Sequence, residues 1–210
     1  MKISKKFLIS FSIVFISLFI AFTASAAQPL SAPQVTASNV ASTGKIRISW
    51  DAVDGAAKYQ IYRATSKDGS YSFLASTTNT SAVNTKINAG ETYYYYVRAV
   101  DNNGKKSAKS NIVGRTCDLA RPVVTVSNIA STGKIKVSWN AVSGASKYTM
   151  YRSETGKTGS WTAVDVAATK TSITHSTATA GTKYYYKLRA IHTNESANSA
   201  YSTTVNITSK

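Results

Sequence analysis

Few residues of this 210-residue chain have the types and spacing that catalysis needs. Its two histidines, His175 and His192, would have to stand beside a serine or cysteine in a rigid pocket to form a catalytic triad. The spacing marks no such partner, so we expect both to be ordinary surface or loop residues. The nine acidic residues mostly fall at turns, and no insertion could form the sugar groove that a carboxylate pair for glycoside hydrolysis would flank. Histidine and cysteine are too scattered for metal-ligand spacing, so the sequence predicts a protein that is not an enzyme and has no cofactor or metal.

Two isolated signals add no chemistry. Gly156-Lys157-Thr158 is similar to the end of a phosphate-binding loop, but Tyr151 stands where that loop has its first glycine, and no helical pattern follows. Cys117 is the single cysteine, which rules out an intrachain disulfide. In an exported chain a lone thiol is either a chance residue or a handle for dimerisation. We favour the first reading and expect a monomer.

The chain contains an internal repeat of about 90 residues. Residues 41–50 return as 130–139 with only conservative changes, and residues 55–63 return as 144–152. A period this long does not suit a solenoid, whose repeats cannot bury a core alone; it suits a small β domain that folds by itself. We therefore predict a domain over 32–116, a linker over 117–121 and a second domain over 122–208.

Alternation of apolar and polar residues predicts a strand over 45–50 and another over 58–62, each with a counterpart in the second copy. In the tyrosine-rich strand that follows, the two copies together show which side faces the core. Lys187 stands where the first copy has Tyr96, and lysine is rarely buried. The alternate residues that share a face with Tyr96 and Lys187 are therefore predicted to point outward. The predicted inward residues are Tyr93, Tyr95, Val97 and Ala99 in the first copy and Tyr184, Tyr186, Leu188 and Ala190 in the second.

The remaining strands have weaker signals. Segments rich in Thr and Ser predict a strand within 78–87 and another within 169–173. Asn102-Asn103-Gly104 is a hairpin signal that leads to a final strand near 111–115, whose counterpart is 203–207. Helical periodicity is not sustained anywhere after the N-terminal segment, so we predict no helix there.

The pattern Trp, then Tyr-x-Ile/Met-Tyr-Arg, then Gly-x-x-Tyr-Tyr-Tyr-x-Val/Leu-Arg-Ala resembles bacterial fibronectin type III domains over nearly all of 32–208. The resemblance maps the family's strand-B tryptophan to Trp50 and Trp139, and its tyrosine-corner residue to Tyr93 and Tyr184. It implies an all-β fold of two immunoglobulin-like, seven-stranded β-sandwiches in tandem. The paired cysteines of an immunoglobulin domain are absent from the sequence.

The resemblance also implies that the strand bearing Tyr62 and the tyrosine strand are neighbours in one sheet. Aromatic rings stack on sugars or bases, while Arg and Lys attract phosphate or carboxylate. The same residue types stabilise a sheet through cross-strand pairs, so a ligand face and plain sheet stabilisation both stay open. The candidate ligand face consists of Tyr62, Tyr94, Tyr96 and Arg98 in the first copy and of Tyr151, Tyr185, Lys187 and Arg189 in the second.

The first 26 residues have the pattern of a secretory signal peptide: a basic start, an apolar run and a cleavage site at Ala24-Ser25-Ala26. The run is short for a membrane-spanning helix, which needs about 20 residues, so we expect cleavage and no transmembrane segment. Without residues 1–26 the chain has 22 basic and 9 acidic residues, a formal net charge of +13. Such an excess attracts polyanions through a field that salt screens.

Together these observations predict a secreted, non-catalytic tandem protein that acts as a binding or spacer module at the bacterial cell surface or in the extracellular matrix. Its expected partner is an anionic cell-wall polymer or polysaccharide, or another surface protein. We expect no binding to a specific nucleic acid. The alternative is an accessory carbohydrate-binding module of a polysaccharide-degrading system, which would hold neutral glycan through the tyrosines. Salt separates the two readings, because charge-driven binding weakens as ionic strength rises and ring stacking persists.

Overall fold

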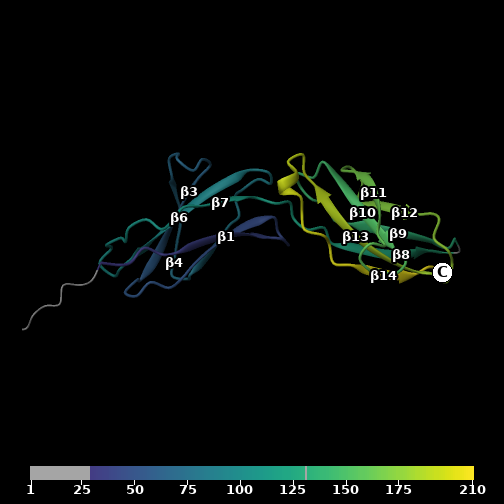
Figure 1. Cartoon of the computed structure of the whole chain (residues 1–210), viewed down its shortest axis with the longest axis horizontal. Coiled ribbons are helices and arrows are strands. Elements are labelled where there is room, and N and C mark those ends of the chain that lie inside the picture. Colours follow the sequence, from purple (N-terminus) through teal and green to yellow (C-terminus); the bar gives the residue numbers. More distant parts are fainter. Residues whose placement is uncertain (1–28, 131) are drawn as a thin grey trace, which may run out of the picture.

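The structure, a computed structural model, describes residues 29–130 and 132–210, and the predicted signal peptide lies outside the described residues. Apolar and polar side chains alternate along most strands. Each half of the chain therefore buries its apolar side between two antiparallel sheets (Figure 1). No helix in the part of the chain that the structure describes is long and apolar enough to cross a membrane.

Domain 1, the name used here for residues 32–116, has a three-stranded and a four-stranded sheet. The three-stranded sheet has the order β1-β2-β5 and consists of β1 (Val35–Val40), β2 (Lys45–Trp50) and β5 (Ser81–Asn84). The four-stranded sheet has the order β4-β3-β6-β7 and consists of β4 (Ser72–Thr77), β3 (Lys58–Ala64), β6 (Thr92–Val100) and β7 (Val113–Thr116).

Domain 2, residues 122–208, repeats this topology strand for strand. Its three-stranded sheet, in the order β12-β9-β8, consists of β8 (Val124–Ile129), β9 (Lys134–Trp139) and β12 (Ser172–His175). Its four-stranded sheet, in the order β11-β10-β13-β14, consists of β11 (Thr162–Ala167), β10 (Lys147–Ser153), β13 (Lys183–Ile191) and β14 (Val205–Thr208). The predicted fold class, two seven-stranded sandwiches in tandem, is confirmed.

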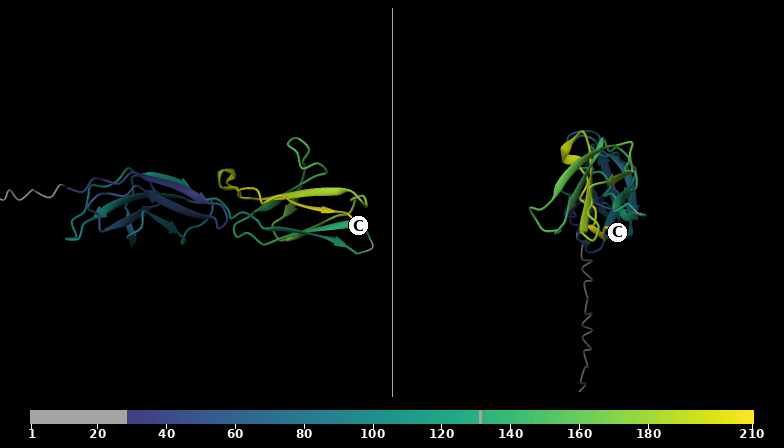
Figure 2. Two further views of the ribbon diagram at one scale, coloured as in Figure 1. Left: turned by 90° about the horizontal axis from the view of Figure 1, so that it is seen from below. Right: turned by 90° about the vertical axis from the view of Figure 1, so that its right-hand side faces the viewer.

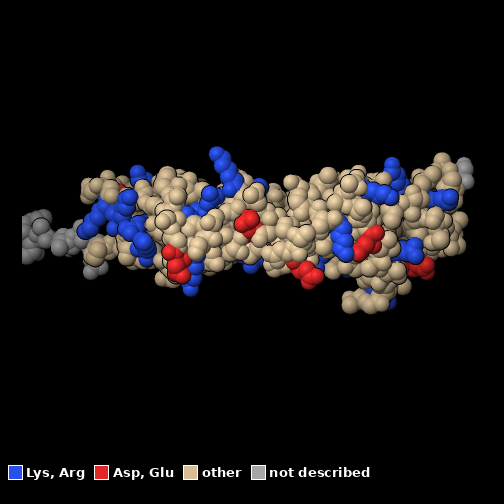
Figure 3. All heavy atoms as spheres, turned by 90° about the horizontal axis from the view of Figure 1, so that it is seen from above, with Lys and Arg blue, Asp and Glu red and all other residues tan. Residues whose placement is uncertain are grey.

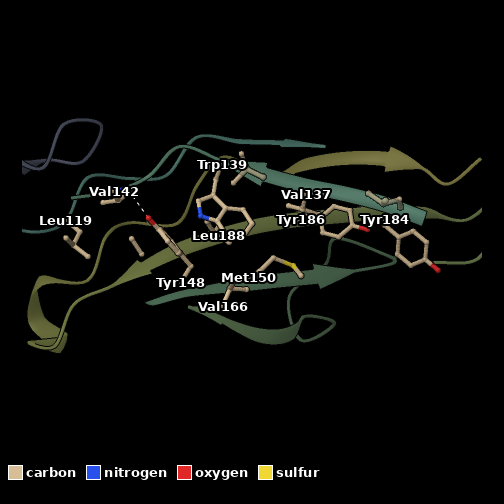
Figure 4. Close-up of a cluster of buried hydrophobic side chains, with 13 residues drawn as sticks. Leu119, Val137, Trp139, Val142, Tyr148, Met150, Val166, Tyr184, Tyr186 and Leu188 are labelled. Atoms are coloured by element: carbon tan, nitrogen blue, oxygen red, sulfur yellow. Dashed lines mark hydrogen bonds between the residues drawn. The ribbon is translucent and has the colours of Figure 1, made fainter. Parts of the chain in front are cut away.

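Each domain has its own hydrophobic core, in which a tryptophan packs against a tyrosine. The ring centroids of Trp50 and Tyr59 lie 5.4 Å apart, and so do those of Trp139 and Tyr148 (Figure 4). The predicted inward residues of the tyrosine strand are all buried in both copies. Comparing the two copies therefore assigned the two faces of this strand correctly.

Tyrosine corners close both sandwiches, as the resemblance implied. The hydroxyl of Tyr93 accepts a hydrogen bond of 3.1 Å from the backbone N–H of Asn88, and that of Tyr184 accepts one of 3.0 Å from Thr179. Each bond spans five residues and fixes the turn that precedes the long strand of its domain.

The four strands that the sequence patterns did not locate are β1, β4, β8 and β11. All four lie at a sheet edge, where a strand pairs on one side only and needs few apolar residues. The strand expected within 78–87 is β5, which lies inside that range, whereas β12 begins within the expected range 169–173 and extends beyond it to His175. The predicted absence of helix holds in the described residues, apart from one 3-10 turn, η1 (Glu195–Ala197).

The chain between the hairpin turn at Asn103 and β7 is bonded through serine side chains. The hydroxyls of Ser107 and Ser110 accept hydrogen bonds of 3.0 Å from the backbone N–H groups of Ala99 and Val97. The backbone N–H groups of both serines also donate to the carbonyl oxygens of Ala99 and Val97. The final strand, predicted near 111–115, is β7 (Val113–Thr116).

The predicted linker, 117–121, is divided between the two cores. Cys117 is fully buried in the core of domain 1, where its thiol donates to the carbonyl oxygen of Gly44 at 3.1 Å. Leu119 is buried in the core of domain 2, and its N–H donates to the carbonyl oxygen of Ala197 at 2.8 Å. Only one residue separates these two anchors, so the connection is short and held at both ends.

Further contacts join the domains beside this connection. The N–H of Arg121 donates to the carbonyl oxygen of Ala41 at 2.7 Å, and Nδ2 of Asn194 donates to that of Gly90 at 3.3 Å. The imidazole of His192 packs so closely on Gly90 that a Cβ there would collide with it. The sandwiches lie end to end in an elongated molecule, with the start of the described chain (purple) and the C-terminus at opposite ends (Figure 2).

Candidate functional site

The candidate ligand face lies on the outer side of the two four-stranded sheets. Strand pairing places Tyr62 of β3 opposite Tyr96 of β6, and Tyr151 of β10 opposite Lys187 of β13. In both domains these two strands are therefore neighbours in one sheet, as the resemblance implied. The side chains on the outer side of the sheet are arranged differently in the two domains.

In domain 1, four rings form what we call the aromatic cluster: Tyr62, Tyr71, Phe73 and Tyr96. Tyr62 stacks on Tyr96 with centroids 4.7 Å apart and planes 14° apart. Phe73 of the edge strand meets Tyr62 edge-on at 5.9 Å, and Tyr71 lies 5.0 Å from Tyr96. Phe73 is 57% exposed, which makes it the most accessible ring of the cluster.

The expectation that Tyr96 contributes an exposed ring is wrong. This ring points outward as predicted, but it is only 6% exposed because Tyr62 and Tyr71 cover it. Burial, together with the neighbouring Tyr62, raises the pKa of the Tyr96 phenol, which stays neutral. Tyr96 is thus the buried floor of the aromatic cluster, and Phe73 is its exposed ring.

Two ammonium groups border the aromatic cluster. Nζ of Lys109 lies 5.0 Å from the Tyr96 ring centroid, and Nζ of Lys106 donates to Oη of Tyr62 at 3.5 Å. Arg98 has a structural role, because its Nη1 donates to the carbonyl oxygen of Ser107 at 3.2 Å and holds the loop after β6. Domain 1 therefore presents ring faces beside cations, which suits stacking on a sugar and attraction of an anionic group.

In domain 2 the corresponding face is closed by its own lysine. Nζ of Lys187 lies 4.2 Å from the Trp161 ring centroid, 4.8 Å from that of Tyr201 and 5.7 Å from that of Tyr151. Arg189 donates to the carbonyl oxygen of Ser199 at 2.7 Å, as its counterpart does in domain 1. The rings of this face already surround a cation, which favours sheet stabilisation over ligand binding here.

Tyr94 and Tyr185 do not join either group of rings. A Cβ at Gly114 would lie 2.7 Å from the ring of Tyr94, and one at Gly156 would lie 3.0 Å from the ring of Tyr185. Each tyrosine therefore covers a glycine backbone instead of extending the candidate face.

Sequence reasoning missed several members of the two faces. Tyr71 and Trp161 were recognised only as aromatics after a turn, and Phe73 belongs to an edge strand that was not located. Lys109 and Tyr201 occupy equivalent places in an irregular segment after the tyrosine strand, where no periodic signal marks them. A cross-copy comparison of aromatic and basic residues outside the strands could have found this last pair.

The two histidines lie in different surroundings, and one of the two expectations is wrong. His175 is only 6% exposed and its Nδ1 lies 2.8 Å from Oη of Tyr186, so it is a core residue. Burial, with Arg152 nearby, holds the pKa of this imidazole below its usual range. His192 is half-buried at the domain junction. Within residues 29–130 and 132–210, no group of three or more His, Cys, Asp or Glu residues could hold a metal ion.

Comparison with known proteins places the fold. Residues 31–113 match the family of GH85 endohexosaminidase C-terminal domains. The structure is similar to a two-domain fibronectin type III segment of chicken tenascin, with a TM-score of 0.51 and 18% identity over 85% of this chain and 100% of that one. The fibronectin type III fold of both domains is thereby confirmed.

Several known enzymes are similar to parts of the chain. An amylopullulanase of Thermoanaerobacter thermohydrosulfuricus is 44% identical over 89 residues, which are 41% of this chain and 6% of the relative. Exoglucanase B of Cellulomonas fimi is 31% identical over 201 residues, 86% of this chain and 17% of the relative. A poly(3-hydroxybutyrate) depolymerase of Delftia acidovorans is 37% identical over 81 residues, 39% of this chain and 16% of the relative. The chain thus spans less than a fifth of the length of the curated relatives it matches.

Proposed function

We propose that this chain, a tandem pair of domains with the fibronectin type III fold, is a secreted, non-catalytic module that holds attached or neighbouring components at a fixed distance along an extracellular polymer. The observation that carries the proposal is the junction. Cys117 and Leu119 anchor the connection in opposite cores, and His192 packs directly on Gly90. Two sandwiches joined in this way form an extended spacer whose length is set by its fold.

The relatives support a spacer over a substrate-specific module. The matched enzymes are named amylopullulanase, exoglucanase and poly(3-hydroxybutyrate) depolymerase, and these names indicate polymers that differ in chemistry. A module that read one substrate would not suit all three. Similar domains therefore serve a need that these enzymes share, which is to work on large polymers.

Charge supplies the general attraction in this proposal. Domains 1 and 2 carry 11 and 9 basic residues against 5 and 3 acidic ones, so each has a formal net charge of +6. On the face shown in Figure 3, Lys and Arg gather most densely near the end of domain 1 that carries the N-terminal segment. An anionic cell-wall polymer or polysaccharide is the partner that this distribution favours.

A second candidate function, binding of neutral glycan, rests on the aromatic cluster. Tyr62 and the exposed Phe73 could stack on a sugar ring, whereas the exposed ring of domain 2, Tyr201, already lies against Lys187. In this case domain 1 would bind and domain 2 would extend the reach.

Co-sedimentation at low and high salt tests both functions. We expect the chain to be retained on purified cell wall and on acidic polysaccharide at low salt and released at high salt. Retention on neutral glucan that survives high salt and disappears in Phe73→Ala, but not in the domain 2 control Tyr201→Ala, would establish the second function instead. Absence of retention on every polymer at low salt would overturn polymer binding.

A further inference from the structure

Domain 2 has a polar cavity that lies outside the candidate ligand face. It has a volume of about 350 Å³ and is lined by the end of β10, the loop that follows it, the end of β12 and the start of β13. This volume is within the range of small-molecule sites, about 300–1,000 Å³. Its lining includes Arg152, Ser153, Glu154, His175, Thr177 and Tyr184.

A single residue difference between the two domains changes the side-chain contacts beside this cavity. In domain 1, Nδ2 of Asn84 donates to Oη of Tyr95 at 3.0 Å. In domain 2 the same place is taken by His175, whose Nδ1 bonds to Oη of Tyr186. The larger imidazole also packs edge-on against Tyr184, with ring centroids 4.8 Å apart.

The same difference leaves Arg152 of domain 2 with fewer contacts than its counterpart Arg63 has in domain 1. In domain 1 the guanidinium of Arg63 lies 5.3 Å from the Tyr93 ring centroid and donates to the carbonyl oxygen of Lys86 at 3.0 Å. In domain 2 the equivalent ring, that of Tyr184, is in contact with His175 instead. Arg152 has one long hydrogen bond of 3.5 Å, to Oγ1 of Thr177. No carboxylate of the described chain lies within ion-pair distance of Arg152.

The histidine contributes a second group to the cavity. Its ring is more than nine-tenths buried, Nδ1 is bonded to Tyr186, and Nε2 has no hydrogen-bond partner among the described residues. The imidazole lines the cavity beside Arg152. The guanidinium group of Arg152 and Nε2 of His175 thus line the same cavity, and both can form further hydrogen bonds.

The loop that walls the cavity is held in place before any ligand arrives. Oγ of Ser153 accepts hydrogen bonds from the N–H groups of Thr155 at 3.1 Å and Gly156 at 2.9 Å, and it lies 2.6 Å from Oγ of Ser160. Domain 1 has Ala64 in the place of Ser153 and cannot form this network. A preformed wall reduces the ordering that binding requires.

We propose that this cavity binds a sugar residue that carries a carboxylate, as the uronate units of an acidic polysaccharide do. The carboxylate would lie between Arg152 and Nε2 of His175, where a charge-assisted hydrogen bond forms. The hydroxyl groups of the sugar would bond to the threonine hydroxyls and to Glu154, whose carboxylate accepts hydrogen bonds at the rim. The inference rests on the proposed function for the choice of a polysaccharide unit as the ligand.

Titration of the chain with free D-glucuronate, followed by amide and imidazole NMR signals, tests the proposal. Glucose is the matched control, because it has the same ring without the carboxylate, and acetate has the carboxylate without the ring. We expect glucuronate to shift signals of Arg152, His175 and the loop 153–160 and to bind about tenfold or more tightly than either control. Equal binding of glucose or acetate, or shifts spread over both domains, would overturn the proposal.

Two variants locate the site. Arg152→Gln should weaken glucuronate binding about tenfold or more, while the domain 1 counterpart Arg63→Gln leaves it unchanged. His175→Asn installs the residue that domain 1 uses at this place, so it keeps the fold, and it should also reduce binding by letting Arg152 return to Tyr184. If His175→Asn folds and binds glucuronate as the parent does, the proposal is wrong. Loss of glucuronate binding with intact polymer retention, or the reverse, distinguishes failure of this site from failure of the proposed function.

Discussion

The two domains share a topology and differ at their outer faces in an instructive way. In domain 1 a tyrosine, Tyr96, occupies the middle of the face and Lys109 covers it. In domain 2 a lysine, Lys187, occupies the middle and Tyr201 lies against it. The aromatic and the cationic partner have exchanged places, and the contact between them is kept. The exposed ring of domain 1 is Phe73 and that of domain 2 is Tyr201, which lies against Lys187 and Arg189.

A second exchange distinguishes the interiors. The buried amide of Asn84 bonds to a tyrosine hydroxyl in domain 1, and the buried imidazole of His175 does so in domain 2. An amide does not titrate, whereas an imidazole does so near neutral pH. The same place in the fold therefore holds a group that does not titrate in domain 1 and one that does in domain 2.

The largest expected effect is on the stability of the individual domains, because each domain has its own hydrophobic core. Trp50→Ala should destabilise domain 1 by about 3–5 kcal/mol and leave domain 2 folded, and Trp139→Ala should do the reverse. Thermal unfolding followed by domain-resolved NMR signals measures this. Loss of both domains in either variant would show that the cores unfold as one unit.

A smaller effect is expected from a pair of glycines at equivalent turns. Gly90 has a φ of +84° and Gly181 one of +81°, so alanine at either position should cost about 1–2 kcal/mol from backbone strain. Only at Gly90 would the added Cβ also collide with His192, because nothing lies within 4 Å of a Cβ at Gly181. Gly90→Ala should therefore change the angle between the domains, measured by small-angle X-ray scattering, whereas Gly181→Ala should not.

The exchange at the outer face predicts a double-mutant cycle. Lys187→Tyr and Tyr201→Lys should each destabilise domain 2 by about 0.5–1 kcal/mol. The first removes the cation from its rings, and the second removes a ring and places a second ammonium group beside Lys187. The double variant reproduces the arrangement of domain 1 and should recover most of this loss. Additive losses, measured by chemical unfolding, would mean that the two positions do not interact.

The smallest expected effect is the pH dependence of domain 2. The pKa of buried His175 is held below its unfolded value, so the unfolded state binds the extra proton. The stabilisation is complete above about pH 6.5, the unfolded pKa, and is lost as the pH falls below it. Tyr184, Tyr186, Arg152 and Glu154 surround the ring.

We therefore expect the Tm of domain 2, but not of domain 1, to fall between pH 7 and pH 5. His175→Asn should remove this dependence, and Asn84→His should introduce it into domain 1. A fall of equal size in both parent domains would contradict the assignment.

The sequence predicted those parts of the fold in which alternation is strong. The faces of β2 and of the tyrosine strand followed directly, because their inward residues are apolar or aromatic in both copies. Four of the edge strands, β1, β4, β8 and β11, escaped prediction, because a strand that pairs on one side only needs few apolar residues. The burial of Tyr96 and His175 could not be predicted either, since it depends on Tyr71 and Tyr186, which other strands and loops bring into place.

The central claim, that the two sandwiches form one extended spacer with a fixed junction, has a direct test in residual dipolar couplings of the chain in a weakly aligning medium. We predict that a single alignment tensor fits the couplings of both domains with the orientation shown in Figure 2. Two tensors of different magnitude would show that the domains turn independently, and the account would then be wrong.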